Sequence, residues 1–149
     1  MHEFNLEELI RDTIEEMNPT LKTGQNITYK NTCKSLITSD KNLIRNILFN
    51  LISNAIKFSD ISNPIHIVSQ IKDNIICVSI QDEGMGISEE DKEHLFSSFF
   101  RGRNVTNIQG TGLGLHIVKR YVDLLRGSIT MESTLGKGTK ITFSIPEKE

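Results

Sequence analysis

The feature that most constrains the fold is a long amphipathic helix, predicted from Lys41 to about Phe58 and capped by Ser39-Asp40. Its apolar residues share one side of the helix: Ile44, Ile47, Leu48, Leu51, Ile52 and Ala55. Such a stripe has to be buried against another layer of structure. The next segments, Pro64 to Ile71 and Ile75 to Asp82, are predicted strands that Lys72-Asp73-Asn74 joins into a hairpin. We therefore expect the helix to lie on a sheet.

The remaining segments add helices and strands on either side of this unit. We predict a helix over Leu6 to Met17 with Asn5 as its N-cap, short strands over Asn26 to Thr32 and Leu36 to Thr38, a helix from about Leu113 to Arg126, and strands over Ser128 to Thr134 and Thr139 to Ile145. Gly127 stands where a helix C-cap favours positive φ. Strict βαβ alternation is missing. The order predicts an α+β fold, a two-layer sandwich with helices on one face of a mixed or antiparallel sheet.

Length and composition limit the class of protein. The chain of 149 residues is expected to form one domain, 1–149, with a core that needs no disulfide or metal. Its net charge of −2 provides no basic field, which disfavours nucleic acid as a partner. Cys33 and Cys77 lack metal-ligand spacing and fit a reducing, cytoplasmic setting. No apolar run approaches the roughly 20 residues of a membrane helix, so we expect no membrane contact by this domain, whatever anchors a parent protein.

The long helix also carries a polar stripe. Asn46, Asn50, Asn54 and Lys57 recur at spacings of four, four and three residues, so they share one face. Asparagine is a mediocre helix former, and each one costs roughly a few tenths of a kcal/mol. A solvated polar face explains the stripe when it is taken alone. The alternative is a row of amide oxygens for Mg²⁺, with Lys57 directed at an anion.

Asp82 ends a strand in which Ile76, Val78 and Ile80 form the apolar side. It continues that phase, so its carboxylate is expected to point inward and to need a hydrogen-bond donor. A ligand amino group is one donor, and a turn or capping role is the simpler alternative for a lone aspartate. Gly84 and Gly86 follow, and they permit either close approach to a flat ligand or an ordinary turn.

From Glu83 to Gly110 the apolar pattern breaks down, which predicts a mobile lid over about 83–112. Phe96, Phe99 and Phe100 cluster there beside Arg101, either as a tether to the core or as a latch that leaves Arg101 available to phosphate. Gly110-Thr111-Gly112-Leu113-Gly114 then opens a helix, where free amides favour an anion. The run is neither a dinucleotide fingerprint nor a P-loop, because its third glycine comes one residue early and no Gly-Lys-Ser/Thr follows.

The order of these features resembles the catalytic ATP-binding domain of bacterial histidine kinases, in the superfamily shared with gyrase B, the heat-shock chaperone ATPase and the mismatch-repair ATPase. The resemblance covers nearly the whole chain, from Phe4 to Pro146. The family's boxes correspond to 50–58 (N box), 82–87 (first glycine box), 96–101 (F box) and 110–115 (second glycine box), and 136–146 is similar to its last hairpin. The fold that the resemblance implies is the Bergerat sandwich.

The resemblance also implies ATP and Mg²⁺ as cofactors. Asn54 matches the position that binds Mg²⁺, with Asn50 as a polar neighbour, and Asp82 matches the carboxylate that receives the adenine amino group, with Thr139 near it through water. Further matches are phosphate contacts and glycines of the pocket and lid. The implied ATP-binding set is Asn50, Asn54, Lys57, Phe58, Asp82, Gly84, Gly86, Ile87, Phe96, Arg101, Gly110, Thr111, Gly112, Leu113, Gly114 and Thr139.

The implied function is transfer of the γ-phosphoryl group of Mg-ATP to a histidine on a separate dimerisation domain, for relay to a response regulator receiver domain. Two departures from the family pattern stand out. Ser97-Ser98 replaces the Glu-Pro common in the F box, which bears on the rigidity of the lid. His2-Glu3 mimics the start of an acceptor motif, but no proline or helical hairpin follows in register. We therefore interpret the chain as a catalytic fragment without its acceptor histidine, and assign no catalytic residue.

Two rival functions stay open at this point. An anti-sigma serine kinase or ATPase of the same superfamily would place a glutamate four residues before the Mg²⁺ asparagine, where this chain has Asn50. An amide cannot take a proton as a general base. A nucleotide-free pseudokinase that only docks partners is disfavoured by the retained Asn54 and Asp82.

Overall fold

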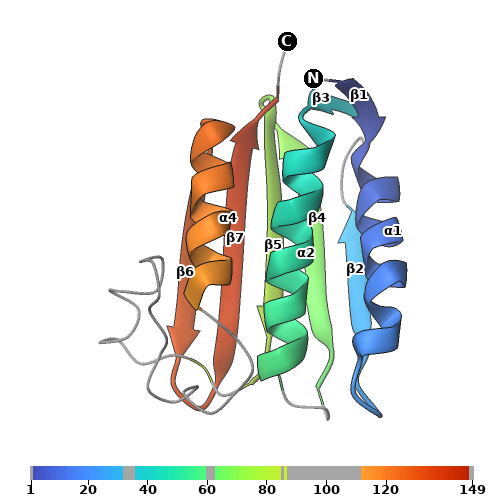
Figure 1. Ribbon diagram of the computed structural model, residues 1–149, viewed down its shortest axis with the longest axis vertical. Helices are drawn as coiled ribbons and strands as arrows, with labels where there is room; N and C mark the ends of the chain where they lie inside the picture. The colour runs from blue at the N-terminus through green and yellow to red at the C-terminus, as the bar shows by residue number, and fades with distance from the viewer. Residues whose placement is uncertain (1, 32–35, 60–62, 85, 87–111, 148–149) are drawn as a thin grey trace.

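The protein is a two-layer α+β sandwich, as predicted. The computed structural model describes residues 2–31, 36–59, 63–84, 86 and 112–147. Helices α1 (Leu6–Met17), α2 (Lys41–Phe58) and α4 (Gly112–Leu124) lie side by side on one face of a five-stranded sheet (Figure 1). The strands, in spatial order, are β2 (Ile27–Asn31), β4 (Ile65–Lys72), β5 (Ile75–Asp82), β7 (Gly138–Pro146) and β6 (Ser128–Thr134).

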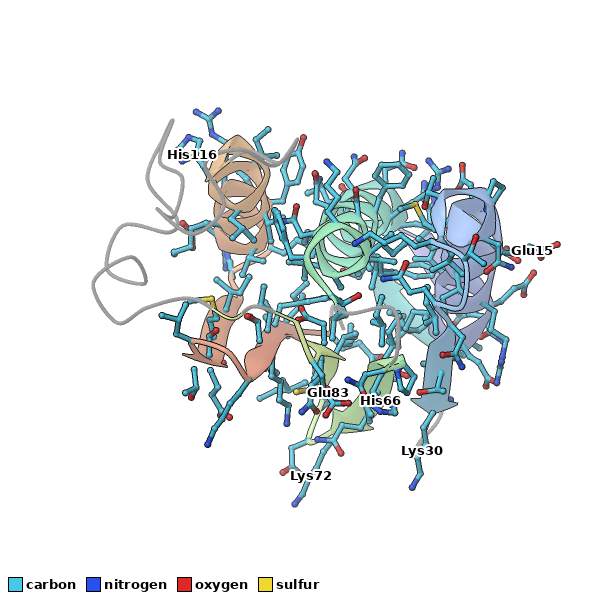
Figure 2. The ribbon with its side chains drawn as sticks, turned by 90° about the horizontal axis from the view of Figure 1, so that it is seen from below. Glu15, Lys30, His66, Lys72, Glu83 and His116 are labelled. Carbon is cyan, nitrogen blue, oxygen red and sulfur yellow. The ribbon has the colours of Figure 1, made fainter. Side chains whose placement is uncertain are left out.

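The sheet is mixed, because β2 runs parallel to β4 whereas all the other neighbours are antiparallel. One face is apolar and covered by the helices. The other face carries polar side chains, among them Lys30, His66 and Lys72, which project away from the helices (Figure 2). This division follows the alternation of each strand, since successive side chains point to opposite faces.

The core lies between α2 and the covered face of the sheet. The predicted apolar stripe of α2 is buried, with no member more than 3% exposed. It packs on inward side chains of the central strands, including Ile67, Val78, Ile80 and Phe143. Each fully buried side chain of this size contributes about 1.5–3 kcal/mol from removal of apolar surface from water. No helix in the described part of the chain is long and apolar enough to span a membrane.

The predicted N-caps of α1 and α2 are confirmed. The Asn5 side chain accepts a hydrogen bond from the Glu8 amide at 2.9 Å, and Asp40 accepts one from the Leu43 amide at 3.0 Å. These caps satisfy amides that have no partner inside the helix. The α1 helix ends at Met17 and a 3-10 turn, Asn18–Thr20, follows it.

A small second sheet has two strands, and the first of them was not predicted from the sequence. Strand β1 (His2–Asn5) pairs antiparallel with β3 (Leu36–Ser39), and the register places Phe4 opposite Ile37, both of which are buried. Four residues are too few to show a clear alternation, so only the pairing with β3 reveals this strand.

The α4 prediction was wrong in two details. The spacing predicts one apolar face made of Ile117, Val118, Tyr121, Leu124 and Leu125. Val118 and Leu125 are buried as predicted, but Ile117 and Leu124 are 37% and 65% exposed, and the unpredicted Val122 is buried in the core. The residue with positive φ after the helix is Arg126, at 60°, rather than Gly127. Gly127 is required for another reason, because a Cβ there would collide with the backbone oxygen of Ser144. Sequence periodicity does not show which flank of a helix a neighbouring strand covers.

Candidate functional site

The site begins with a buried carboxylate at the end of β5. Asp82 is only 9% exposed, so the predicted inward orientation is confirmed. The backbone amides of Gly84 and Thr139 donate to its carboxylate, the first at 2.9 Å. Burial raises the pKa of Asp82 from 3.8 to about 6, although both hydrogen bonds oppose the shift. The side chain is therefore an ionised acceptor at neutral pH in a poorly solvated place.

Around Asp82, backbone segments lie in direct contact because glycines stand at the points where they meet. A Cβ on Gly84 would collide with the carbonyl oxygen of Phe58 at the end of α2. A Cβ on Gly138, where φ is 116°, would collide with the backbone oxygen of Asp82. Glycine alone permits both approaches, since any side chain begins with the colliding atom. The end of α2, the end of β5 and the β6–β7 hairpin thus meet at one point.

The hairpin side of the site is built by register. Thr139 lies directly opposite Asp82 in the ladder between β5 and β7. Its hydroxyl lies 2.8 Å from the Ser133 hydroxyl, which also donates to the Gly138 carbonyl at 2.9 Å. The predicted proximity of Thr139 to Asp82 is therefore present, through a backbone hydrogen bond. Ser133 and Gly138 were not predicted at the site, and only the strand register reveals them.

The polar stripe of α2 runs toward the helix end that reaches this junction. Asn50 and Asn54 are half-buried, whereas Lys57, in the last turn, is exposed. The Asn50 side-chain nitrogen donates to the Asn46 carbonyl at 2.8 Å, so this amide is engaged with the helix backbone. The last turn of α2 meets the end of β5, because Phe58 lies against Gly84, so the C-terminal end of α2 and the end of β5 that carries Asp82 lie at the same end of the sandwich (Figure 1).

A solvent-connected cleft of about 710 Å³ borders the junction. It has both polar and aromatic lining residues: Phe58, Ser59, Asn63, Glu83, Gly84, Gly136 and Lys137. Its volume lies within the usual range for a small-molecule site. The structure therefore places two of the predicted residues, Phe58 and Gly84, on the wall of a cleft.

The structure tests only part of the predicted set. It brings Phe58, Asp82, Gly84 and Thr139 together, and it places Gly86 beside the backbone of Thr134. Of the glycine run that begins at Gly110, the structure describes the part from Gly112 onward, which begins α4 (Gly112–Leu124). Several predicted positions lie outside the described residues: Ile87, Phe96, Arg101, Gly110 and Thr111.

The oxygen ligands near the site could hold a divalent ion that takes only one or two ligands from the protein. Among the described residues there is no group of three or more histidine, cysteine, aspartate or glutamate side chains that would hold a metal. Mg²⁺ commonly takes one or two protein oxygens and completes its shell with phosphate and water. A half-buried amide such as Asn54 fits that requirement.

Comparisons with known proteins agree with this geometry. Residues 39–149 match the family described as histidine kinase-, DNA gyrase B- and HSP90-like ATPases. The sensor histidine kinase GacS of Pseudomonas protegens is 36% identical over 95% of this chain. The chain covers only 16% of that protein's length.

Solved structures extend the comparison to the fold. The catalytic domain of histidine kinase ThkA, in a nucleotide-free form, superposes with a TM-score of 0.85 at 32% identity, covering 98% of this chain and 95% of that one. Full-length ShkA, in complex with AMPPNP, gives a TM-score of 0.84 at 26% identity, covering 98% of this chain and 31% of that one. The chain belongs to the histidine kinase-, DNA gyrase B- and HSP90-like ATPase family. Within it, the chain is a histidine kinase catalytic domain with the Bergerat fold.

Proposed function

We propose that this domain binds Mg-ATP and donates the γ-phosphoryl group to a histidine on a separate dimerisation domain, for relay to a response regulator receiver domain. The observation that carries the proposal is the buried carboxylate of Asp82 beside a junction that only glycines permit. A purine has a flat face and an exocyclic amino group. The amino group can donate to the Asp82 carboxylate, and the cleft that borders this junction has room for a small molecule. The AMPPNP bound by ShkA supports the same class of ligand.

At the adenine end, Asp82 accepts a hydrogen bond from the amino group. Desolvation makes the free carboxylate costly, and a donor from the ligand offsets that cost. A hydrogen bond to a charged group of this kind is worth about 1.5–3 kcal/mol. Gly84 keeps the end of α2 close enough to close one side of the pocket.

At the phosphate end, Asn54 supplies an amide oxygen to Mg²⁺ and Lys57 supplies positive charge. Mg²⁺, when bound, neutralises phosphate charge and orients the transferring group. The N-terminus of α4, at Gly112, also favours phosphate oxygens, because the positive end of the helix dipole lies there. Phosphoryl transfer requires little covalent chemistry from the protein, so positioning and charge account for catalysis. The bond between the γ-phosphorus and the ADP oxygen breaks as a bond to the acceptor imidazole nitrogen forms.

The alternative of a serine kinase or hydrolase is less well supported. Those relatives require a general base at position 50, and this chain has an amide whose nitrogen already donates to the Asn46 carbonyl. An amide cannot take the proton of an attacking hydroxyl or water.

The proposal is tested by binding first and transfer second. Isothermal calorimetry of the chain with Mg-ATP is expected to show binding. Addition of a separate dimerisation domain with labelled ATP is expected to yield acid-labile phosphate on that domain. Strong ATP hydrolysis by the chain alone, or acid-stable label, would favour the hydrolase or serine kinase instead.

A further inference from the structure

The C-terminus of α2 is held by a segment distant in the sequence. The connection between the 3-10 turn and β2 contributes Lys22 and Gln25. The Lys22 ammonium donates to the Lys57 carbonyl at 3.0 Å and to the Ser59 carbonyl at 3.4 Å. The Gln25 amide donates to the Ile56 carbonyl at 3.1 Å and to the Ser59 hydroxyl at 2.5 Å. We call Lys22 and Gln25 together the α2 clamp.

The two residues of the α2 clamp are themselves ordered by burial and by a hydrogen bond between them. Gln25 is only 7% exposed, and its side-chain oxygen accepts from the Lys22 amide at 2.9 Å, so one residue orders the other. The last carbonyls of a helix have no partner inside it, and a cation near them interacts favourably with the helix dipole. The clamp satisfies two of these carbonyls, those of Ile56 and Lys57, and continues to Ser59.

The Phe58 carbonyl lies between the two carbonyls that Lys22 binds, those of Lys57 and Ser59, and it contacts the candidate site. Phe58 presents its oxygen to Gly84, whose amide donates to the Asp82 carboxylate at 2.9 Å. The last turn of α2 therefore accepts the hydrogen bonds of the clamp and also packs closely against Gly84. Any shift of that turn would change the distance between the phosphate-side residues of α2 and the carboxylate on β5.

We propose that Lys22, ordered by Gln25, is a positioning residue of the nucleotide site. This inference rests on the function proposed above and extends it to two residues that match no nucleotide-binding motif. The clamp sets the place of the α2 terminus, and thereby the spacing between Asn54 and Lys57 on the helix and Asp82 on the sheet. Small displacements of positioned groups are costly, so the effect on binding exceeds the contribution of one surface hydrogen bond.

The test compares three lysine variants of the chain by calorimetry with Mg-ATP. Lys22→Met removes the ammonium and keeps the side-chain length, and we expect about three- to tenfold weaker binding, where tenfold corresponds to 1.4 kcal/mol. Lys22→Arg keeps a cationic donor and is expected to bind within about twofold of the parent chain. Lys72→Met is the matched control. Lys72 pairs with Ile75, the first residue of β5, whereas Asp82 is the last residue of that strand, so this variant is expected to leave binding unchanged.

Two further measurements separate positioning from general effects. Mg-ATP affinity is measured at low and at high ionic strength, because salt screens a distant charge and does not restore a displaced helix end. A loss in Lys22→Met that persists at high ionic strength reports positioning, whereas a loss that disappears there would reduce Lys22 to a distant charge and overturn the proposal. The Gly84 amide resonance of the unliganded chain is expected to shift in Lys22→Met and not in Lys72→Met. Gln25→Met should weaken binding at least as much as Lys22→Met, measured at a temperature where thermal melting shows it folded.

The outcomes are distinguishable. If the parent chain binds Mg-ATP and Lys22→Met binds it equally well with an unshifted Gly84 amide, the positioning role is wrong and the proposed function stands. Equal losses in Lys22→Met and Lys22→Arg would also overturn it. If the parent chain binds no Mg-ATP, the proposed function fails and this inference fails with it.

Discussion

The two ends of the candidate site are built in different ways. Around Asp82 the structure depends on backbone, with glycines that allow carbonyls and strands to meet without intervening side chains. Along α2 it depends on side chains, with half-buried asparagines and an exposed lysine on an ordinary helix. Backbone contacts inside a packed layer cannot relax when an atom is added, whereas partly exposed side chains can. The sheet end should therefore tolerate change far less than the helix end.

The largest effect is expected from Gly84→Ala. The added methyl group would meet the Phe58 carbonyl, a backbone atom that cannot rotate away, and we expect a loss of about 3 kcal/mol in the free energy of unfolding together with loss of nucleotide binding. Gly136→Ala is the matched control, because open space surrounds that position and only its φ of 84° is strained, at about 1–2 kcal/mol. Urea unfolding measures both. Equal losses would show that the Gly84 contact is not tight.

Asp82→Asn should mainly affect binding. The variant keeps the shape and removes the charged acceptor, so Mg-ATP affinity is expected to fall by about 10- to 100-fold, in line with 1.5–3 kcal/mol for such a hydrogen bond. Calorimetry measures the change. Unchanged affinity would refute the assignment of Asp82 to adenine.

The raised pKa of Asp82 gives a pH dependence of opposite sign for stability and for binding. Between pH 3.8 and about 6 the folded chain holds this proton more tightly than the unfolded chain, so the unliganded protein loses roughly 1–3 kcal/mol of stability from this group as pH rises through that window. ATP affinity should rise through the same window as the carboxylate ionises. Urea unfolding of Asp82→Asn, which lacks the group, is expected to show a flatter pH profile. A parallel profile would contradict the shift.

The smallest effect is expected on the helix side. Asn54→Ala should cost about tenfold in ATP affinity, or 1.4 kcal/mol, and only when Mg²⁺ is present, because the amide would act through the ion. Asn46→Ala, on the same stripe but two turns earlier, is the control and should bind normally. A loss for Asn54→Ala that is equal without Mg²⁺ would assign the residue a different contact.

Much of the fold was predictable because its signals are local. The apolar stripe of α2, the caps at Asn5 and Asp40 and the alternation that turns Asp82 inward all depend on residues within a few positions of each other. The hairpin between β4 and β5 was also predictable, and its turn residues Asp73 and Asn74 both adopt positive φ, at 55° and 62°, as a tight two-residue turn requires.

The sequence by itself thus determined the layers of this protein and the orientation of its key carboxylate, since periodicity and capping are properties of neighbouring residues. Only the tertiary structure decided what lies against that carboxylate. The collision that excludes a side chain at Gly138, the strand β1 and the α2 clamp of Lys22 and Gln25 join segments separated by tens of residues. Such contacts carry no pattern along the chain, because they depend on how packed elements meet in space.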